Sequence, residues 1–263
     1  MKKLYLLLLL MPRPATAEEI INISPEQAST IGKKIWKNEC AAMTPECLTE
    51  WNPGEEFPSL GIGHFIWYPK AYKGPFEEAF PMLKVFFLQK GAPMPKWLDS
   101  TEHCPWDSRS QFFNEFKSPK MVELRKFLKD TIPLQAQFEA ERLKAALPKI
   151  LAATAPENRA SVRQQFYRVA KDPRGLYVLM DYVNFKTDGT LATARYKGKG
   201  WGLLQVLEGM TGKESGQPAL DEFYRSALAA LEQRVKNSPP ERNEARWLPG
   251  WRNRLQTYRS NLN

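Results

Sequence analysis

The feature that most limits what this chain can fold into is the helical spacing of its apolar residues from position 75 to the C-terminus. In the segment 75–90, apolar side chains recur three or four residues apart, at Phe76, Phe80, Leu83 and Phe87, and Gly91 follows as a stop signal. The same spacing predicts further helices at about 108–117, 119–129, 133–152, 157–171, 173–182, 200–210, 218–236 and 241–262. Because the connections between these segments are short, we expect a compact helical body.

The chain before position 75 combines one helix with a small β element. Ser24–Gln27 reads Ser-Pro-Glu-Gln, which places Ser at the N-cap, Pro at the first helical position and Gln three residues after the cap. This helix should run to about Glu39. Residues 40–57 are rich in Pro, Gly, Thr and Asn and predict a loop, whereas residues 59–68 are β-like and contain two glycines. The predicted fold class is mainly α with a small β-hairpin (α+β), as a single domain over residues 18–263.

The N-terminus has the three parts of a secretory signal. Two lysines, Lys2 and Lys3, precede the apolar run Leu4–Met11, and the small residues of Ala15-Thr16-Ala17 follow. The run is much shorter than the roughly 20 residues of a spanning helix, so no stable membrane insertion is expected. We therefore expect a signal peptide at 1–17, cleaved after Ala17, and a periplasmic or secreted protein. The alternative is the frayed first helix of a cytosolic protein.

The charge balance favours acidic partners without choosing among them. The chain has a formal net charge of +9, and its composition, 43% hydrophobic and 25% charged, is that of an ordinary globular protein. Peptidoglycan, anionic lipid and nucleic acid would all attract such a chain. The basic residues are interspersed with acids instead of forming a dense block, which argues against a nucleic-acid interface.

Three cysteines, Cys40, Cys47 and Cys104, predict one disulfide and one free thiol in an oxidising compartment. We favour a Cys40–Cys104 bridge, and the other two pairings remain open. A metal site is not expected, because the sequence has only His64 and His103 and no CxxC pair. No cofactor is expected.

The predicted buried face of the first helix ends in an acidic residue, Glu39. The buried face is predicted at Ala28, Ile31 and Ile35. Glu39 lies four residues further on, so it falls on the same face in the last turn. Burial and the negative end of the helix dipole would both raise its pKa, which suits a general acid near neutral pH. The alternatives are a Glu paired with an arginine, such as Arg252 or Arg254, or a Glu facing solvent.

The segment after this helix carries a recognisable motif. A helix that ends in Glu39, a loop with acids, and the hairpin Gly61-Ile62-Gly63-His64 resemble the lysozyme-like superfamily, phage lysozymes in particular, over about residues 25–70. In those enzymes the helix-terminal Glu is the general acid, and an acid and a hydroxyl lie on the other side of the sugar. The resemblance implies a lysozyme-like helical domain, with Glu39 as the acid and Ser59 as the hydroxyl.

The second catalytic acid implied by the resemblance is Glu55 or Glu56, with Asp181 as a less favoured candidate. The loop is longer than in phage lysozymes and contains no Asp. A longer loop suits a more distant carboxylate with a water between, the inverting arrangement. The resemblance further implies that His64 organises the hairpin. The expected substrate is peptidoglycan or a related amino-sugar polymer, and we expect a monomer.

Polar residues set among aromatic ones suggest further contacts with sugar. Asp181 and Asn184 lie in an apolar segment, and Trp201 is flanked by glycines. Such sites offer fixed hydrogen bonds beside an apolar ring face. Trp67 and Trp97 could stack on sugar rings. The alternative is that these aromatic residues belong to the core. The C-terminal stretch Pro249–Arg254 resembles the arginine-rich closing helix of phage-type lysozymes.

Three functions are therefore in competition. The first is an envelope glycoside hydrolase that uses two carboxylates. The second is a glycan-binding protein on the same scaffold without turnover. The third is an envelope interaction protein with no role in sugar binding, in which Glu39 forms a buried structural salt bridge.

Overall fold

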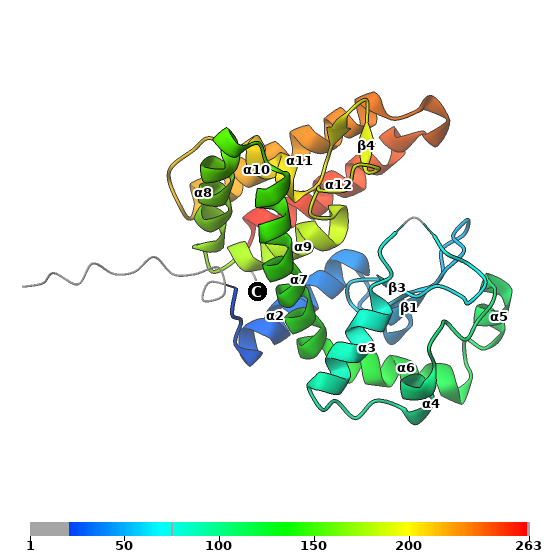
Figure 1. Ribbon diagram of the computed structural model, residues 1–263. Coiled ribbons are helices and arrows are strands. Elements are labelled where there is room, and N and C mark those ends of the chain that lie inside the picture. The colour runs from blue at the N-terminus through cyan, green and yellow to red at the C-terminus, as the bar shows by residue number, and fades with distance from the viewer. Residues whose placement is uncertain (1–20, 75, 262–263) are drawn as a thin grey trace, which may run out of the picture.

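A computed structural model of the protein describes residues 21–74 and 76–261 (Figure 1). The predicted signal peptide, residues 1–17, lies outside the described residues. The α-helices are α2 (Pro25–Glu39), α3 (Phe80–Gln89), α4 (Lys96–Ser100), α5 (Arg109–Asn114), α6 (Pro119–Asp130), α7 (Ile132–Ala153), α8 (Arg159–Ala170), α9 (Gly175–Lys186), α10 (Leu203–Glu208), α11 (Gln217–Asn237) and α12 (Leu248–Gln256). Short 3₁₀ turns lie at Pro45–Leu48, Pro156–Asn158, Pro240–Arg242, Glu244–Trp247 and Thr257–Arg259. The prediction of a mainly helical α+β protein is confirmed.

The first helix begins as the sequence predicts. The Ser24 N–H donates to Gln27 Oε1 at 2.9 Å, and the Gln27 N–H donates to Ser24 Oγ at 3.2 Å. These two bonds close a capping box, which satisfies amides that have no partner inside the helix. The helix ends at Glu39, because Cys40 is extended at φ −141°.

Two small antiparallel sheets accompany the helices. The first has the order β1 (Thr49–Glu50), β2 (Ser59–Leu60) and β3 (Phe65–Ile66), and the second pairs β4 (Arg195–Tyr196) with β5 (Lys199–Gly200). The β-like stretch predicted at 59–68 thus forms β2 and β3. Strand β1 was not predicted from the sequence; it lies in the predicted loop and places Glu50 opposite Ser59.

The turn between β2 and β3 needs its glycines, because it lies directly on α7. Gly61 has φ +75°, and a Cβ there would lie 2.4 Å from Gln135 Oε1. A Cβ on Gly63 would lie 2.9 Å from Glu139 Oε1. The same Gln135 oxygen accepts a hydrogen bond from the Ile62 N–H at 2.9 Å. This close packing fixes the position of the next residue, His64.

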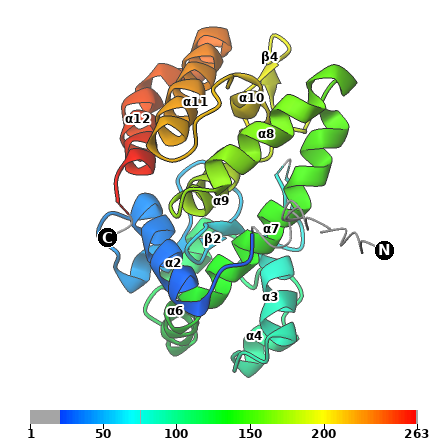
Figure 2. The same ribbon diagram turned by 90° about the vertical axis from the view of Figure 1, so that its left-hand side faces the viewer.

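Helix α7 runs through the middle of the molecule. Figure 1 shows α3–α6 and the three-stranded sheet on one side of α7, and α8–α12 with the β4–β5 hairpin on the other. Helix α2 packs along α7, and Figure 2 shows these two helices beside α9. One cluster of buried apolar side chains extends from Ile21 to Tyr258. Within the described ranges, no helix combines the length and apolar character needed to cross a membrane.

Helix α4 was not predicted, and the helix boundaries differ most from prediction at two places. The helix predicted at 75–90 begins at Phe80, because the Glu78 carboxylate accepts a hydrogen bond from the Tyr68 N–H at 2.8 Å instead of joining the helix. The helix predicted at 241–262 is divided. Asn243 takes the left-handed conformation at φ 45°, and α12 begins only at Leu248.

The favoured disulfide is wrong. The bridge joins Cys40 to Cys47, with their Cα atoms 6.0 Å apart, because the chain turns back through the 3₁₀ turn Pro45–Leu48 directly after α2. Cys104 is buried elsewhere, where its backbone N–H donates to the Tyr68 carbonyl at 3.1 Å. Burial raises the pKa of its thiol to about 12. The expectation of a disulfide is confirmed, and the partner is corrected.

Peptide mapping under non-reducing conditions should recover a Cys40–Cys47 cross-link. A thiol reagent should label Cys104 only after unfolding, because the side chain is buried and its thiolate is disfavoured. Cys40→Ser should lower the free energy of unfolding by about 2–3 kcal/mol, as expected for removing a short cross-linked loop. Recovery of a Cys40–Cys104 peptide would contradict this arrangement.

Candidate functional site

The Glu39 carboxylate lies where three distant segments meet. Arg254, on α12, donates from Nη2 to Glu39 Oε1 at 2.6 Å, and Asn184, on α9, donates to the same oxygen at 3.3 Å. His64 Nδ1, from the hairpin, is 3.7 Å from Glu39 Oε2. The Glu39 side chain keeps 16% of its surface exposed. The carboxylate is therefore held on several sides and still reaches solvent.

Asp181 holds the arginine that holds Glu39. Arg254 donates to both Asp181 oxygens at 2.9 Å, from Nε and from Nη2. The Tyr258 hydroxyl donates to Asp181 Oδ2 at 2.5 Å, and Asn38 donates to Oδ1 at 3.1 Å. Asp181 is completely buried. This placement does not support the predicted contact between Asp181 and substrate, because the buried carboxylate has no surface exposed to a ligand. Asp181 instead positions Arg254.

The pKa of Glu39 lies below its ordinary value. Burial is the largest influence and raises it, but the charge of Arg254, the His64 side chain, the Arg254 hydrogen bond and Lys186 together outweigh burial. The expectation of a raised pKa is therefore wrong. Of the two arginines considered from the sequence, Arg254 is the partner, whereas Arg252 pairs with Glu232 at 2.7 Å on an exposed face.

On the far side of His64 lies Glu50, an acid that was not predicted from the sequence. His64 Nε2 is 4.0 Å from Glu50 Oε2, so the imidazole stands between Glu39 and Glu50. The Glu50 side chain is 36% exposed. Across the sheet, Glu50 faces Ser59, which is buried. A strand of two residues has no periodicity to reveal it, so only the fold brings Glu50 to the site.

The two predicted second acids lie in different surroundings. Glu55 is partly buried, and its carboxylate accepts a hydrogen bond from Asn52 at 3.2 Å. The pKa of Glu55 is raised, chiefly by burial. Nearby Glu50 also raises this pKa, whereas nearby His64 lowers it. Glu55 therefore belongs to the neighbourhood of His64. Glu56 is exposed and lines a separate hollow of about 580 Å³ together with Pro69, Lys70, Ala71, Tyr72 and Asp107.

Of the tryptophans predicted to contact sugar, Trp67 and Trp201 belong to the interior, whereas Trp97 is partly exposed and lines a separate hollow with Lys120 and Glu123. Trp67 is completely buried against Phe80, with ring centroids 4.9 Å apart, so neither face is open to a sugar. Trp201 is 8% exposed and packs against Tyr196 at 4.8 Å. The Arg234 guanidinium lies 4.2 Å from the Trp201 ring centroid. Of the sugar-contact residues predicted from sequence, the structure brings His64 and Asn184 directly to Glu39.

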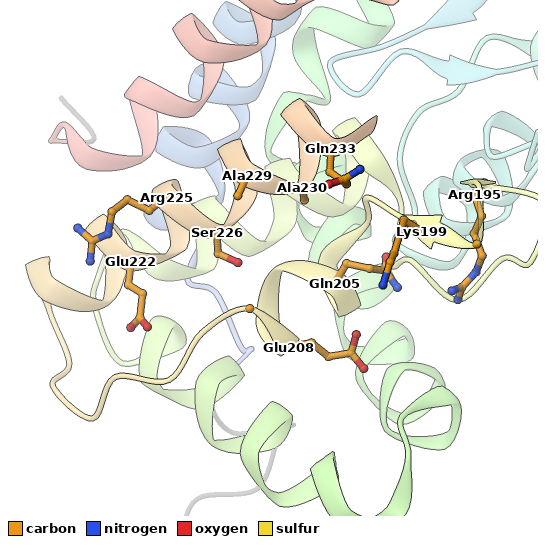
Figure 3. A pocket seen from close by; sticks show the side chains of 13 residues that line it. Arg195, Lys199, Gln205, Glu208, Glu222, Arg225, Ser226, Ala229, Ala230 and Gln233 are labelled. Atoms are coloured by element: carbon orange, nitrogen blue, oxygen red, sulfur yellow. The ribbon is translucent and has the colours of Figure 1, made fainter. Parts of the chain in front are cut away.

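A hollow of about 610 Å³ lies away from these acids, between the β4–β5 hairpin, α10 and α11 (Figure 3). Figure 3 shows Lys199, Glu208 and Glu222 around it. Burial raises the pKa of Glu208, and Arg195 and Lys199 oppose that rise. None of the residues predicted to be catalytic lines this hollow. In the part of the chain that the structure describes, no group of three or more His, Cys, Asp or Glu could hold a metal ion.

Comparison with protein-family models, with curated proteins and with solved structures found no match. The function therefore has to be inferred from the side chains around Glu39. They offer one ionised, partly exposed carboxylate with a fixed arginine on one side. On the other side they offer an imidazole with further acids beyond it.

Replacing Arg254 with Met should raise the pKa of Glu39, because burial then acts without the guanidinium. Carbon-13 NMR titration of the glutamate carboxyl carbons measures this change. Arg252→Met is the matched control and should leave the Glu39 titration unchanged, since Arg252 pairs with an exposed acid. Adding Asp181→Asn to Arg254→Met removes the buried charge that would otherwise lose its partner. Equal Glu39 titrations in all variants would contradict this electrostatic account.

The same lowered pKa makes stability depend on pH. The ionised form of Glu39 stabilises the folded state at pH values above its unfolded pKa. That contribution is lost as the pH falls through its folded pKa.

Proposed function

We propose that this protein is an exported glycoside hydrolase on a lysozyme-like helical scaffold, acting on peptidoglycan or a related amino-sugar polymer. The observation that carries the proposal is the contact of the Glu39 carboxylate with His64 of the Gly61–His64 hairpin, with Glu50 on the other side of the ring. Glycoside hydrolysis needs acids on two sides of the scissile bond, one to protonate the leaving oxygen and one to activate water or stabilise the sugar cation.

In this proposal Glu39 donates the proton. Arg254 holds the carboxyl ionised in the free protein, while burial already opposes that charge. A sugar that covers the exposed part of Glu39 removes its remaining water, which disfavours the ionised form further. The Asp181–Arg254 pair fixes the geometry, because Arg254 Nη2 contacts both carboxylates. Asp181 and Arg254 are positioning residues.

The second carboxylate in this proposal is Glu50 or Glu55, and Glu56 is not part of the site. Glu50 lies beyond the His64 ring from Glu39, and Glu55 is electrostatically coupled to both His64 and Glu50. Because the His64 ring lies between Glu39 and Glu50, these two carboxyl groups are widely separated, and a wide separation supports the inverting arrangement. In this proposal Ser59, which is paired with Glu50 across the sheet, orients the attacking water through its hydroxyl.

Export fits the same proposal, because peptidoglycan lies outside the cytoplasm. The Cys40–Cys47 bridge supports an oxidising compartment. We propose that the segment 1–17 is removed after Ala17 and that the protein acts as a monomer in the periplasm or outside the cell.

One observation favours a second function, a glycan-binding protein without turnover. The pKa of Glu39 is lowered in the free protein, and a carboxylate that stays ionised binds hydroxyl groups but donates no proton. Such a protein would sediment with insoluble peptidoglycan and release no soluble fragments.

Glu39→Gln should abolish release of soluble fragments from purified peptidoglycan, with a loss of at least about 10²-fold, because an amide cannot donate the proton. Glu50→Gln or Glu55→Gln should cause a loss of similar size, depending on which of the two is the second carboxylate. Glu56→Gln is the matched control and should keep the full rate. Melting curves establish that each variant folds. Full activity in Glu39→Gln would exclude this mechanism.

The initial rate at low substrate should fall as the pH rises through the pKa of Glu39, because only the protonated carboxyl is a donor. Since Arg254 lowers that pKa, the optimum should lie in the acid range. In Arg254→Met the fall should move to higher pH, as measured by fragment release across the acid and neutral range. A rate that does not change from acid to neutral pH would show that Glu39 is not the donor.

A further inference from the structure

In the part of the chain that the structure describes, the Lys186 ammonium is buried without a hydrogen-bond acceptor. Lys186 is the last residue of α9 and is 8% exposed. Its Nζ lies 3.9 Å from the ring centroid of Phe185 and 3.9 Å from that of Trp251. Among the described residues, no oxygen forms a hydrogen bond or an ion pair with it. Ring faces attract a cation but do not replace a carboxylate, so this ammonium has an unfilled bonding capacity.

The two neighbouring cations both have carboxylates. Arg254 is held by Asp181 and Glu39. Arg234 donates to the two oxygens of Glu244 at 2.6 and 2.9 Å. Burial lowers the pKa of Lys186 well below its usual value, and the charges of Arg234 and Arg254 lower it further, while the more weakly acting Glu244 and Glu39 raise it. A negative charge brought next to Lys186 would relieve both effects.

The lysine belongs to a row of contacts that starts at Glu39. Arg254 bonds Glu39, and its guanidinium lies 4.3 Å from the centroid of the same Phe185 ring that contacts Lys186. On the other side, Trp251 also contacts Arg234, 5.1 Å from its ring centroid. The rings of Phe185 and Trp251 are partly exposed.

We propose that Lys186, between the rings of Phe185 and Trp251, binds a carboxylate carried by the glycan unit next to the one at Glu39. The substrate class is then an acidic amino-sugar polymer. This inference depends on the proposed function. The carboxylate supplies the acceptor that the ammonium lacks, and the partly exposed side chains of Phe185 and Trp251 border the sugar that carries it. A neutral sugar leaves the ammonium unpaired and binds less tightly.

The test compares two sugars that differ in one carboxylate-bearing group, N-acetylmuramic acid and N-acetylglucosamine, by NMR titration of the full chain. The wild type should prefer the acidic sugar by about tenfold or more, as a buried charged hydrogen bond predicts. Lys186→Met keeps the length and apolar contacts and should lose that preference while its affinity for N-acetylglucosamine stays the same. Lys149→Met, on an exposed position of α7, is the matched control and should keep the preference.

A second readout needs no substitution. Acetic anhydride should acetylate Lys186 in the wild type, and N-acetylmuramic acid should protect it while N-acetylglucosamine does not, as followed by mass spectrometry of the Lys186 peptide. Equal affinities for the two sugars in the wild type, a preference that persists in Lys186→Met, or absence of protection would overturn the carboxylate site.

The titration requires no turnover, so the two proposals can fail separately. A carboxylate preference without release of peptidoglycan fragments would keep the site at Lys186 and remove the hydrolase. Fragment release with equal affinities for the two sugars would keep the hydrolase and remove the carboxylate site at Lys186.

Discussion

The Arg254 guanidinium is the group on which the rest of the site depends. It joins Glu39 at the end of α2 to Asp181 in the middle of α9, and it covers the Phe185 ring. Asp181 is fully buried, and removing its cation would cost about 3–5 kcal/mol, the usual penalty for breaking a buried pair. The same contact sets the charge state of Glu39. Arg254 therefore forms a buried structural ion pair with Asp181 and also contacts the proposed catalytic carboxylate of Glu39.

The parts of the structure that could be predicted from sequence are those that local physics determines. Ser24 and Gln27 cap a helix within four residues, and the helical period places Glu39 in its last turn. The glycines at 61 and 63 mark the close approach of the hairpin to α7. The errors concern partners far apart in the chain. The pKa of Glu39 was predicted from its own helix alone, whereas its value depends on Arg254, 215 positions later.

The same limit explains the remaining differences in the site. Glu50 was missed because a strand of two residues leaves no pattern, and Glu56 was kept as an equal alternative to Glu55 although it lines a separate hollow. Composition cannot tell which aromatic rings are exposed, and Trp67 is completely buried. Lys186 carries no motif at all. The proposed role of Lys186 is inferred from its neighbours in space. These are two aromatic rings and two arginines that already pair with carboxylates.

The central claim is that Glu39 is the proton donor in the hydrolysis of a glycan. The most direct test is digestion of purified peptidoglycan in ¹⁸O-labelled water, with mass spectrometry and early-time NMR of the soluble fragments. Hydrolysis by an inverting pair of carboxylates predicts one ¹⁸O at each new reducing end and an inverted anomeric configuration. Peptidoglycan that retains the protein but yields no labelled fragments would contradict the claim and leave a binding protein in its place.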